Sequence, residues 1–224
     1  MVSLGSGRVR EVTALACWPH PERGLLRPED LQPLADGGRA AGALTAWLLD
    51  AACAQLQRWT AGSRDGARLR LGLSLSPAQF ADSALVDLVV ETLGRHRVPP
   101  QRLVLGVSER TVVEHGERAR ARLAELHRIG VRVAVEGFGT GYSSLDGLRR
   151  TPVDRLAVDA SFVEGLGRPG VEGGLAEAVV AMARSLRLET VAEGLTDEDQ
   201  VGPLVAAGCR LGSGPRFSAS LEPD

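Results

Sequence analysis

Apolar residues recur along the chain at two spacings, and each spacing predicts one type of element. Leucines occupy every second position from Leu69 to Leu75, a period of two that predicts a strand. From Ala40 to Trp59, apolar residues recur every three or four positions, which predicts one long helix with a single apolar stripe. Within that stripe, Trp47 and Trp59 are expected to anchor the core. The short β-branched run Val131 to Val135 is typical of a buried parallel strand.

The same reasoning predicts the other elements. Strands are expected at Val9 to Trp18, Leu103 to Val107, Leu156 to Val158, Thr190 to Ala192 and Cys209 to Leu211. Helices are expected from Pro28, and at Leu85 to Leu93, Arg118 to Ile129, Ser144 to Arg150, Leu175 to Leu186 and Gln200 to Ala207. Pro19 is expected to end the first strand, because proline cannot donate to a sheet ladder.

Strands and helices alternate about every 30 residues, as in βαβ units with a parallel sheet. The regular repetition favours a closed barrel over an open sheet, although spacing alone does not decide between them. No linker or repeat divides the chain, so residues 1–224 are expected to form a single domain.

Composition narrows the class of protein. The chain has 224 residues, of which 44% are hydrophobic, enough to bury a core. The formal net charge of -2 gives no electrostatic footprint for nucleic acid or an anionic membrane. No apolar run approaches the ~20 residues of a membrane span. Met1 to Arg10 lacks the apolar segment of a signal peptide, so the cytoplasm is the expected location.

Several kinds of chemistry are disfavoured by residue types. The three cysteines, Cys17, Cys53 and Cys209, lie far apart, which argues against a disulfide framework or a zinc site. They are expected to be buried, reduced thiols. The four histidines show no metal-ligand spacing. The sequence contains no lysine and no asparagine, which excludes any mechanism that needs those side chains.

The stretch Val133 to Leu145 reads as a strand, a glycine-rich loop and the start of a helix. Its glycines permit backbone angles that side chains would forbid. Ser143 or Ser144 is a candidate N-cap for the following helix. Taken alone, such a stretch fits a βα loop in any α/β protein.

A longer comparison makes this stretch specific. Phe138 to Leu145 reads Phe-Gly-Thr-Gly-Tyr-Ser-Ser-Leu and resembles, at eight consecutive positions, the central loop of the EAL-domain family, the cyclic di-GMP phosphodiesterases. Other segments resemble the family in the same order: Trp18 to Pro21, Leu31 to Ala35, Thr151 to Leu156, Ser161 to Val163, Ala192 to Gly194, Gly208-Cys209 and Phe217-Ser218.

The resemblance runs from about Gly7 to Leu221 and implies an α/β fold, a modified (β/α)8 TIM-like barrel. The family begins with a helix and a strand before the segment that matches Val9 to Trp18. Here only Met1 to Leu4 could represent the end of that strand. The barrel is therefore expected to lack the first helix and most of the first strand.

The family hydrolyses its substrate with water held on two Mg²⁺ or Mn²⁺ ions, whose oxygen ligands lie at the carboxyl ends of strands. This chain departs from that pattern. Thr13 replaces the signature glutamate, Ser74 the asparagine and Gly106 a second glutamate. Glu136 and Gly137 replace the aspartate pair. The catalytic lysine and three further polar groups are replaced by Ala157, Thr196, Ser213 and Cys17.

Few functional positions of the family remain. Glu136 and Glu193 are relics of the catalytic set, and neither a catalytic residue nor a metal ligand is assigned with them. Glu193 is expected to be paired with an arginine or partly solvated, because a buried unpaired carboxylate is unfavourable. Leu15 and Asp159 are candidate contacts for the base or ribose of a ligand. Candidates for ordering the central loop and for dimer contact are Glu109, Phe138, Gly139, Thr140, Gly141, Tyr142, Ser143 and Ser144.

These replacements favour loss of catalysis, since removal of one catalytic group commonly costs ~10²–10⁴ in rate. The leading hypothesis is a catalytically degenerate EAL domain of cyclic di-GMP signalling. It would act as a non-hydrolysing regulatory module through a protein partner or a homodimer formed by the central loop, without a cofactor. One alternative is a cyclic di-GMP receptor without hydrolysis. The other is a weak phosphodiesterase that uses Mg²⁺ or Mn²⁺ near Glu136, Asp159 and Glu193.

Overall fold

The computed structural model describes residues 1–36, 40–61, 69–139, 145–164, 166 and 171–218. One sheet has the strand order β1-β10-β9-β8-β7-β6-β5-β2, and neighbouring strands are parallel except for the antiparallel β1 and β10. The strands are β1 (Val2–Ser3), β2 (Glu11–Thr13), β5 (Arg70–Leu75), β6 (Leu103–Ser108), β7 (Arg132–Phe138), β8 (Arg155–Val158), β9 (Glu189–Ala192) and β10 (Leu211–Gly212).

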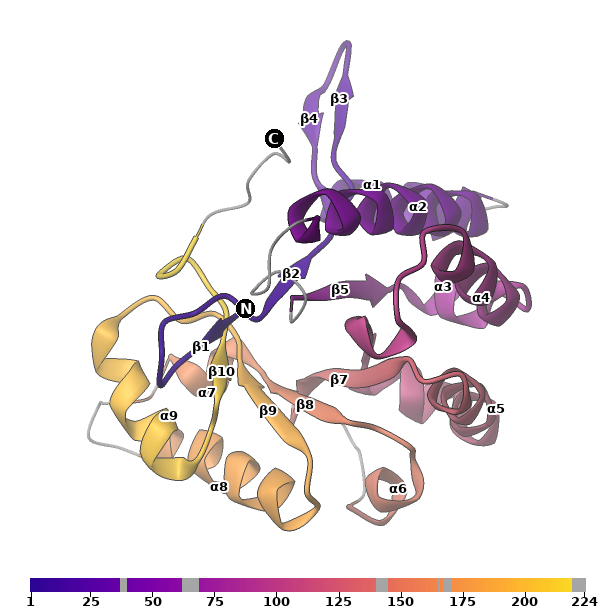
Figure 1. The fold of residues 1–224 in the computed structure, drawn as a ribbon. Coiled ribbons are helices and arrows are strands. Elements are labelled where there is room, and N and C mark those ends of the chain that lie inside the picture. Colours follow the sequence, from indigo (N-terminus) through magenta and orange to yellow (C-terminus); the bar gives the residue numbers. More distant parts are fainter. Residues whose placement is uncertain (37–39, 62–68, 140–144, 165, 167–170, 219–224) are drawn as a thin grey trace.

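The two ends of this sheet meet, so the barrel is nearly closed (Figure 1). Val2 forms an antiparallel bridge with Val9, and the Arg10 amide donates to the Met1 carbonyl over 3.0 Å. These bonds link β1 to the start of β2 and leave little open edge. The predicted fold is confirmed, including a first strand reduced to Val2–Ser3.

Helices surround the sheet (Figure 1). They are α1 (Pro28–Asp36), α2 (Ala40–Thr60), α3 (Pro77–Ala81), α4 (Leu85–Arg95), α5 (Glu109–Arg128), α6 (Leu145–Arg150), α7 (Ala160–Val163), α8 (Val171–Ser185) and α9 (Val201–Ala207), with 3₁₀ turns η2 (Pro100–Arg102) and η3 (Glu198–Gln200). The core lies between helices and sheet, where Leu49 of α2, Leu105 of β6 and Leu123 of α5 are at most 1% exposed. Burying such side chains stabilises the fold by about 1.5–3 kcal/mol each.

A β-hairpin replaces part of the first predicted strand. β2 ends at Thr13, and β3 (Trp18–His20) pairs with β4 (Gly24–Leu26) in a separate sheet that projects from the barrel (Figure 1). The prediction that Pro19 ends a strand is wrong, since Pro19 lies inside β3. A two-stranded ribbon has unpaired outer edges, so a missing N–H there need not break a ladder bond.

The tryptophans of α2 are not core anchors. Trp47 is 57% exposed and Trp59 is 42% exposed. The helix instead buries the face that carries Ala41, Thr45, Leu49, Cys53 and Leu56. Apolar residues lie on more than one face of α2, so their spacing did not identify the buried one.

Helix α5 begins nine residues earlier than predicted, at Glu109 instead of Arg118. Ser108 caps it by accepting a hydrogen bond from the Thr111 amide over 3.1 Å. Gly116, with φ of 50°, interrupts its helical geometry. The first turns are rich in polar residues and gave no apolar period to detect.

None of the helices in the described part of the chain is long and apolar enough to cross a membrane. All three cysteines are free thiols; Cys53 and Cys209 are buried as expected, whereas the expectation of burial is wrong for Cys17, which is exposed.

Candidate functional site

Three neighbouring strands bring Ser74, Gly106 and Glu136 together near their carboxyl ends. Ser74 of β5 pairs with Gly106 of β6, and Ser108 of β6 pairs with Glu136 of β7. Asp159 follows the end of β8 and Glu193 follows the end of β9. Because parallel strands end at the same rim of a barrel, these residues form its mouth.

Glu136 reaches across β6. Its Oε1 accepts a hydrogen bond from Ser74 Oγ over 2.7 Å. The intervening strand has Gly106 at this level, and a Cβ there would overlap the Glu136 carboxylate. The missing side chain of Gly106 therefore provides the space that the longer Glu136 side chain occupies. Burial raises the pKa of Glu136, and the Ser74 hydrogen bond partly offsets that rise.

Glu193 lies in the same field of negative charge. Burial, followed by the charges of Glu136 and Asp159, raises the pKa of Glu193 to about 7. Its side chain is partly exposed, and its carboxylate has no hydrogen bond or ion pair with any residue that the structure describes, whereas its amide donates to the Val158 carbonyl over 3.1 Å. Of the two expectations for Glu193, the structure shows partial solvation and not an arginine partner.

Asp159 has a local structural role. Its Oδ1 accepts hydrogen bonds from the Ser161 amide over 2.9 Å and from Ser161 Oγ over 2.7 Å, which caps α7. Leu15, two residues beyond β2, is 49% exposed. Capping uses one of the two Asp159 oxygens and leaves the other, whereas Leu15 offers an apolar surface.

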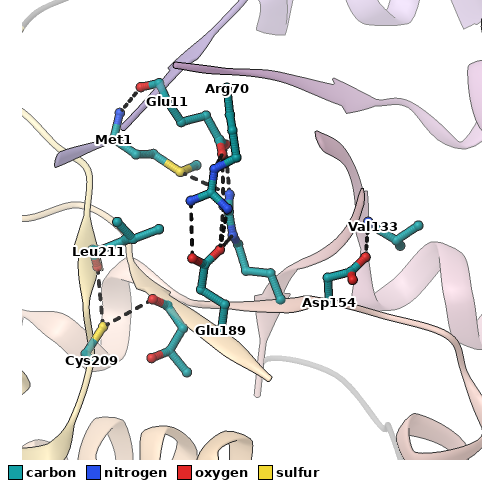
Figure 2. Close-up of polar contacts among 10 residues, drawn as sticks. Met1, Glu11, Arg70, Val133, Asp154, Glu189, Cys209 and Leu211 are labelled. Atoms are coloured by element: carbon teal, nitrogen blue, oxygen red, sulfur yellow. Dashed lines mark hydrogen bonds and ion pairs between the residues drawn. The ribbon is translucent and has the colours of Figure 1, made fainter. Parts of the chain in front are cut away.

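A buried ion cluster closes the opposite end of the barrel. The Arg155 guanidinium donates to both Glu11 oxygens over 2.8 and 2.9 Å, and to Glu189 Oε2 over 2.7 and 2.9 Å. Arg70 donates to both Glu189 oxygens over 3.0 and 3.2 Å, and Figure 2 shows Glu11, Arg70 and Glu189 together. Because β2 and β8 are not neighbours in the sheet, the bonds between Glu11 and Arg155 must cross the barrel interior.

Sequence reasoning missed this cluster. Glu11 and Arg155 are each 1% exposed. The available signal was an ionisable residue at or near the start of several parallel strands, such as Arg70, Arg155 and Glu189. The two arginines balance the two glutamates, which makes burial of these charges tolerable.

The start of the central loop is held by Glu109. Glu109 is 3% exposed, and its Oε2 accepts a hydrogen bond from the Gly139 amide over 2.9 Å. Gly139 has φ of 101°, and a Cβ there would overlap the ring of Phe162. Phe138 is 7% exposed and lies in a cluster with Leu148. The other residues named for this loop lie outside the described residues: Thr140, Gly141, Tyr142, Ser143 and Ser144.

The sequence model of the EAL domain matches residues 1–220, nearly the whole chain. This chain belongs to the EAL domain family. It is 36% identical over 204 residues to the bifunctional diguanylate cyclase/cyclic di-GMP phosphodiesterase MucR of Pseudomonas aeruginosa, covering 91% of this chain and 30% of MucR. It is 33% identical over 221 residues to the cyclic di-GMP phosphodiesterase NbdA of the same organism, covering 99% of this chain and 28% of NbdA.

The structural likeness is equally close. The structure of the MucR phosphodiesterase in complex with cyclic di-GMP has a TM-score of 0.90 and 35% identity, and the match covers 97% of this chain and 87% of that one. The EAL domain thus has the barrel of its relatives, although it spans only about a third of the length of the curated ones.

The EAL family implies two divalent ions, which the side chains at the mouth of the barrel would have to coordinate. Within the described part of the chain, no group of three or more His, Cys, Asp or Glu side chains is arranged to hold a metal ion. Glu136 is bonded to Ser74, and Asp159 caps a helix. Mg²⁺ requires near-octahedral oxygen coordination, which one or two carboxylates supply only with help from water and substrate. The donors that the structure describes in the mouth do not fit a pair of such ions.

Proposed function

We propose that this EAL domain does not hydrolyse cyclic di-GMP and acts as a non-hydrolysing regulatory module of cyclic di-GMP signalling. One observation carries the proposal. The Glu136 carboxylate fills the space above Gly106 and is bonded to Ser74 at 2.7 Å, in the part of the mouth where its family holds metal with other side chains. Membership of the EAL family supports the signalling context.

The rate expected for phosphodiester hydrolysis also supports a non-hydrolysing domain. Hydrolysis of a phosphodiester needs charge stabilisation on the phosphoryl oxygens and an activated water. The chain contains no lysine to supply an ammonium group. Each missing catalytic group costs ~10²–10⁴ in rate, and the resemblance implies that several are missing together.

The regulatory role is proposed to use the central loop. The bond between Glu109 and the Gly139 amide holds the start of this loop against the barrel. A hydrogen bond to a buried carboxylate contributes about 1.5–3 kcal/mol, which stabilises the position of the Gly139 amide. We propose that this loop, attached to the barrel at Gly139, contacts a protein partner or a second copy of the domain.

A cyclic di-GMP receptor is the second candidate. It is favoured by the cyclic di-GMP complex of the MucR phosphodiesterase, which shares 35% identity and the same fold. Leu15 is exposed and could contact a base, and Asp159 keeps one carboxylate oxygen for a ribose. Cys17, however, stands where the resemblance implies a phosphate-binding arginine, so affinity is expected to be weak.

Titration calorimetry with cyclic di-GMP, with and without Mn²⁺, tests these proposals when product is followed by chromatography in the same samples. The MucR phosphodiesterase domain serves as the positive control. We expect no linear dinucleotide product from the protein. Heat of binding without product would identify a receptor. Product that disappears in Glu193→Ala would overturn the proposal and establish an enzyme.

The interaction role needs a separate measurement. Sedimentation velocity across a concentration series would report a dimer, and Tyr142→Ala would disrupt it if the central loop forms the contact. A monomer at all concentrations, together with no partner in crosslinking experiments, would contradict an interaction module.

A further inference from the structure

A hollow of about 380 Å³ lies at the end of the barrel opposite the mouth. It is bounded by the carboxyl ends of α6 and α8 and by the segments that lead into β8 and β9. Its lining is mixed and combines apolar side chains with two hydroxyls and two guanidinium groups: Leu148, Pro152, Val153, Leu186 and Leu188, Thr151 and Ser185, and Arg149 and Arg187. The hollow is separate from the mouth carboxylates, and the proposed function does not use it.

Both arginines are available to a ligand. Arg149 and Arg187 are exposed, and neither forms an ion pair with a residue that the structure describes. A cation in the last turn of a helix is favoured by the helix dipole, which is sufficient to explain an arginine at position 149, in the last turn of α6. Arg187 lies two residues beyond the end of α8, so the helix dipole does not explain an arginine at this position.

Arg187 has an unfavourable backbone conformation, with φ of 62°. It ends α8 in a left-handed turn, in which its amide donates to the Arg184 carbonyl and the Leu188 amide donates to the Ala183 carbonyl, both over 2.9 Å. The helices before β7 and β10 end in the same way with Gly130 and Gly208, at φ of 89° and 99°. Glycine adopts this conformation without strain, whereas arginine does not.

Strain of this kind is often retained where a side chain serves a function. In the described residues, Arg97 is the other residue besides glycine with positive φ, at 50°, and it lines a different hollow. Arg97 therefore offers the same local strain at a different place on the barrel, which makes it a matched control.

We propose that this hollow binds an acidic peptide segment of a protein partner. An apolar side chain of the peptide enters the hollow, and carboxylates on either side pair with Arg149 and Arg187. Arginine suits this role because its planar guanidinium matches a carboxylate with two parallel hydrogen bonds. A buried apolar anchor with charged groups at the rim is the usual anatomy of a peptide contact.

Other anionic partners fit the hollow less well. Single-stranded nucleic acid is held by aromatic platforms along a basic groove, and the described residues that line this hollow include no Phe, Tyr or Trp. A membrane surface is bound by a projecting amphipathic face and not by a recess. The chain carries a formal net charge of -2, so a general attraction to polyanions is not expected.

The proposal is tested by fluorescence anisotropy with a fluorescein-labelled peptide of sequence Asp-Glu-Trp-Leu-Glu-Asp. We expect a Kd between about 10 and 500 μM that weakens as salt screens the charges. Arg149→Ala should weaken binding about tenfold. The uncharged peptide Asn-Gln-Trp-Leu-Gln-Asn and a peptide with serine in place of tryptophan should bind at least about tenfold more weakly. Excess cyclic di-GMP should not compete, which keeps this test independent of the mouth.

Arg187→Gly separates a binding role from a structural one. Relief of the backbone strain should raise the midpoint of thermal unfolding, while loss of the guanidinium should weaken the peptide about tenfold. The control Arg97→Gly should raise the midpoint in the same way and leave peptide affinity within about twofold.

Three results would overturn the proposal. The first is a Kd weaker than about 1 mM for the acidic peptide, and the second is that wild type and Arg187→Gly bind this peptide with equal affinity. The third is that the wild type binds the acidic and the uncharged peptide with equal affinity. Tighter, Arg187-dependent binding of an oligothymidylate or of phosphatidylglycerol vesicles would assign the hollow to nucleic acid or lipid instead.

Discussion

Glu136 and Ser74 are joined by a 2.7 Å hydrogen bond although a whole strand, β6, lies between the strands that carry them. The bond is possible because β6 has Gly106 at the crossing point. A carboxylate one methylene longer than aspartate thus finds a partner inside the protein. This pair occupies the space at the mouth of the barrel that Gly106 leaves free.

Gly106→Ala should therefore destabilise the protein. The new Cβ would overlap the Glu136 carboxylate, so that side chain must rotate and lose its bond to Ser74. We expect a loss of about 1–2 kcal/mol in the free energy of unfolding, measured with urea. Gly94→Ala in α4 is the control, because a Cβ there meets open space. Gly94→Ala should leave the free energy of unfolding unchanged or raise it. Equal losses of stability in the two variants would argue against a Glu136 side chain that passes over Gly106 to Ser74.

The stability of the protein should depend on pH through Glu193. Its pKa is raised from 4.5 to about 7, first by burial and then by Glu136 and Asp159. The stability linked to the protonated form is fully present below pH about 4.5 and is lost as pH rises through about 7. Glu193→Gln should remove this dependence and stabilise the protein at pH about 8 by up to about 3 kcal/mol.

Urea unfolding at several pH values between about 5 and 8 checks this expectation. Glu125→Gln, on the exposed side of α5, is the control and should leave the profile of the wild type unchanged. A wild-type stability that does not fall over this range would contradict the environment described for Glu193.

Arg155→Met should be among the most destabilising single changes. It removes the guanidinium that makes the shorter bonds to both Glu11 and Glu189 and leaves Arg70 as the arginine that pairs with both. Breaking a buried ion pair from one side typically costs about 3–5 kcal/mol. The triple variant Arg155→Met, Glu11→Gln, Glu189→Gln should recover part of that loss. A cost below about 1 kcal/mol for Arg155→Met, measured by urea unfolding, would show that the cluster contributes little.

Glu109→Ala should release the start of the central loop. The Gly139 amide would lose its acceptor, at a cost of about 1.5–3 kcal/mol. Hydrogen exchange of the Gly139 amide should accelerate. Glu109→Gln keeps a carbonyl acceptor at the same place and should retain most of the protection. Similar exchange rates in the two variants would mean that the side-chain oxygen does not hold this amide.

The exposure of Trp47 can be tested against a buried neighbour on α2. Trp47→Ser should cost less than about 1 kcal/mol because the side chain is 57% exposed. Leu49→Ala should cost about 2–5 kcal/mol because Leu49 is fully buried. Thermal unfolding of the two variants gives the comparison, and the reverse order would restore the tryptophan as a core residue.

The sequence by itself determined the order and type of most elements around the barrel. The period-two pattern of Leu69 to Leu75 placed β5 within one residue of its bounds, because alternation follows directly from strand geometry. The short apolar run Leu103 to Val107 placed β6 equally closely. Eight consecutive residues from Phe138 identified the family. The hairpin of β3 and β4 was missed because a short ribbon has no core-facing alternation to read.

The tertiary structure alone decided which charges meet. Glu11 and Arg155 are 144 positions apart, and only closure of the barrel brings β2 and β8 face to face across its interior. Pairing of the neighbouring strands β5, β6 and β7 sets Glu136 over Gly106, and burial in the barrel mouth raises the pKa of Glu193. Local patterns record the period of each element, whereas the energy of a buried charge depends on every strand that surrounds it.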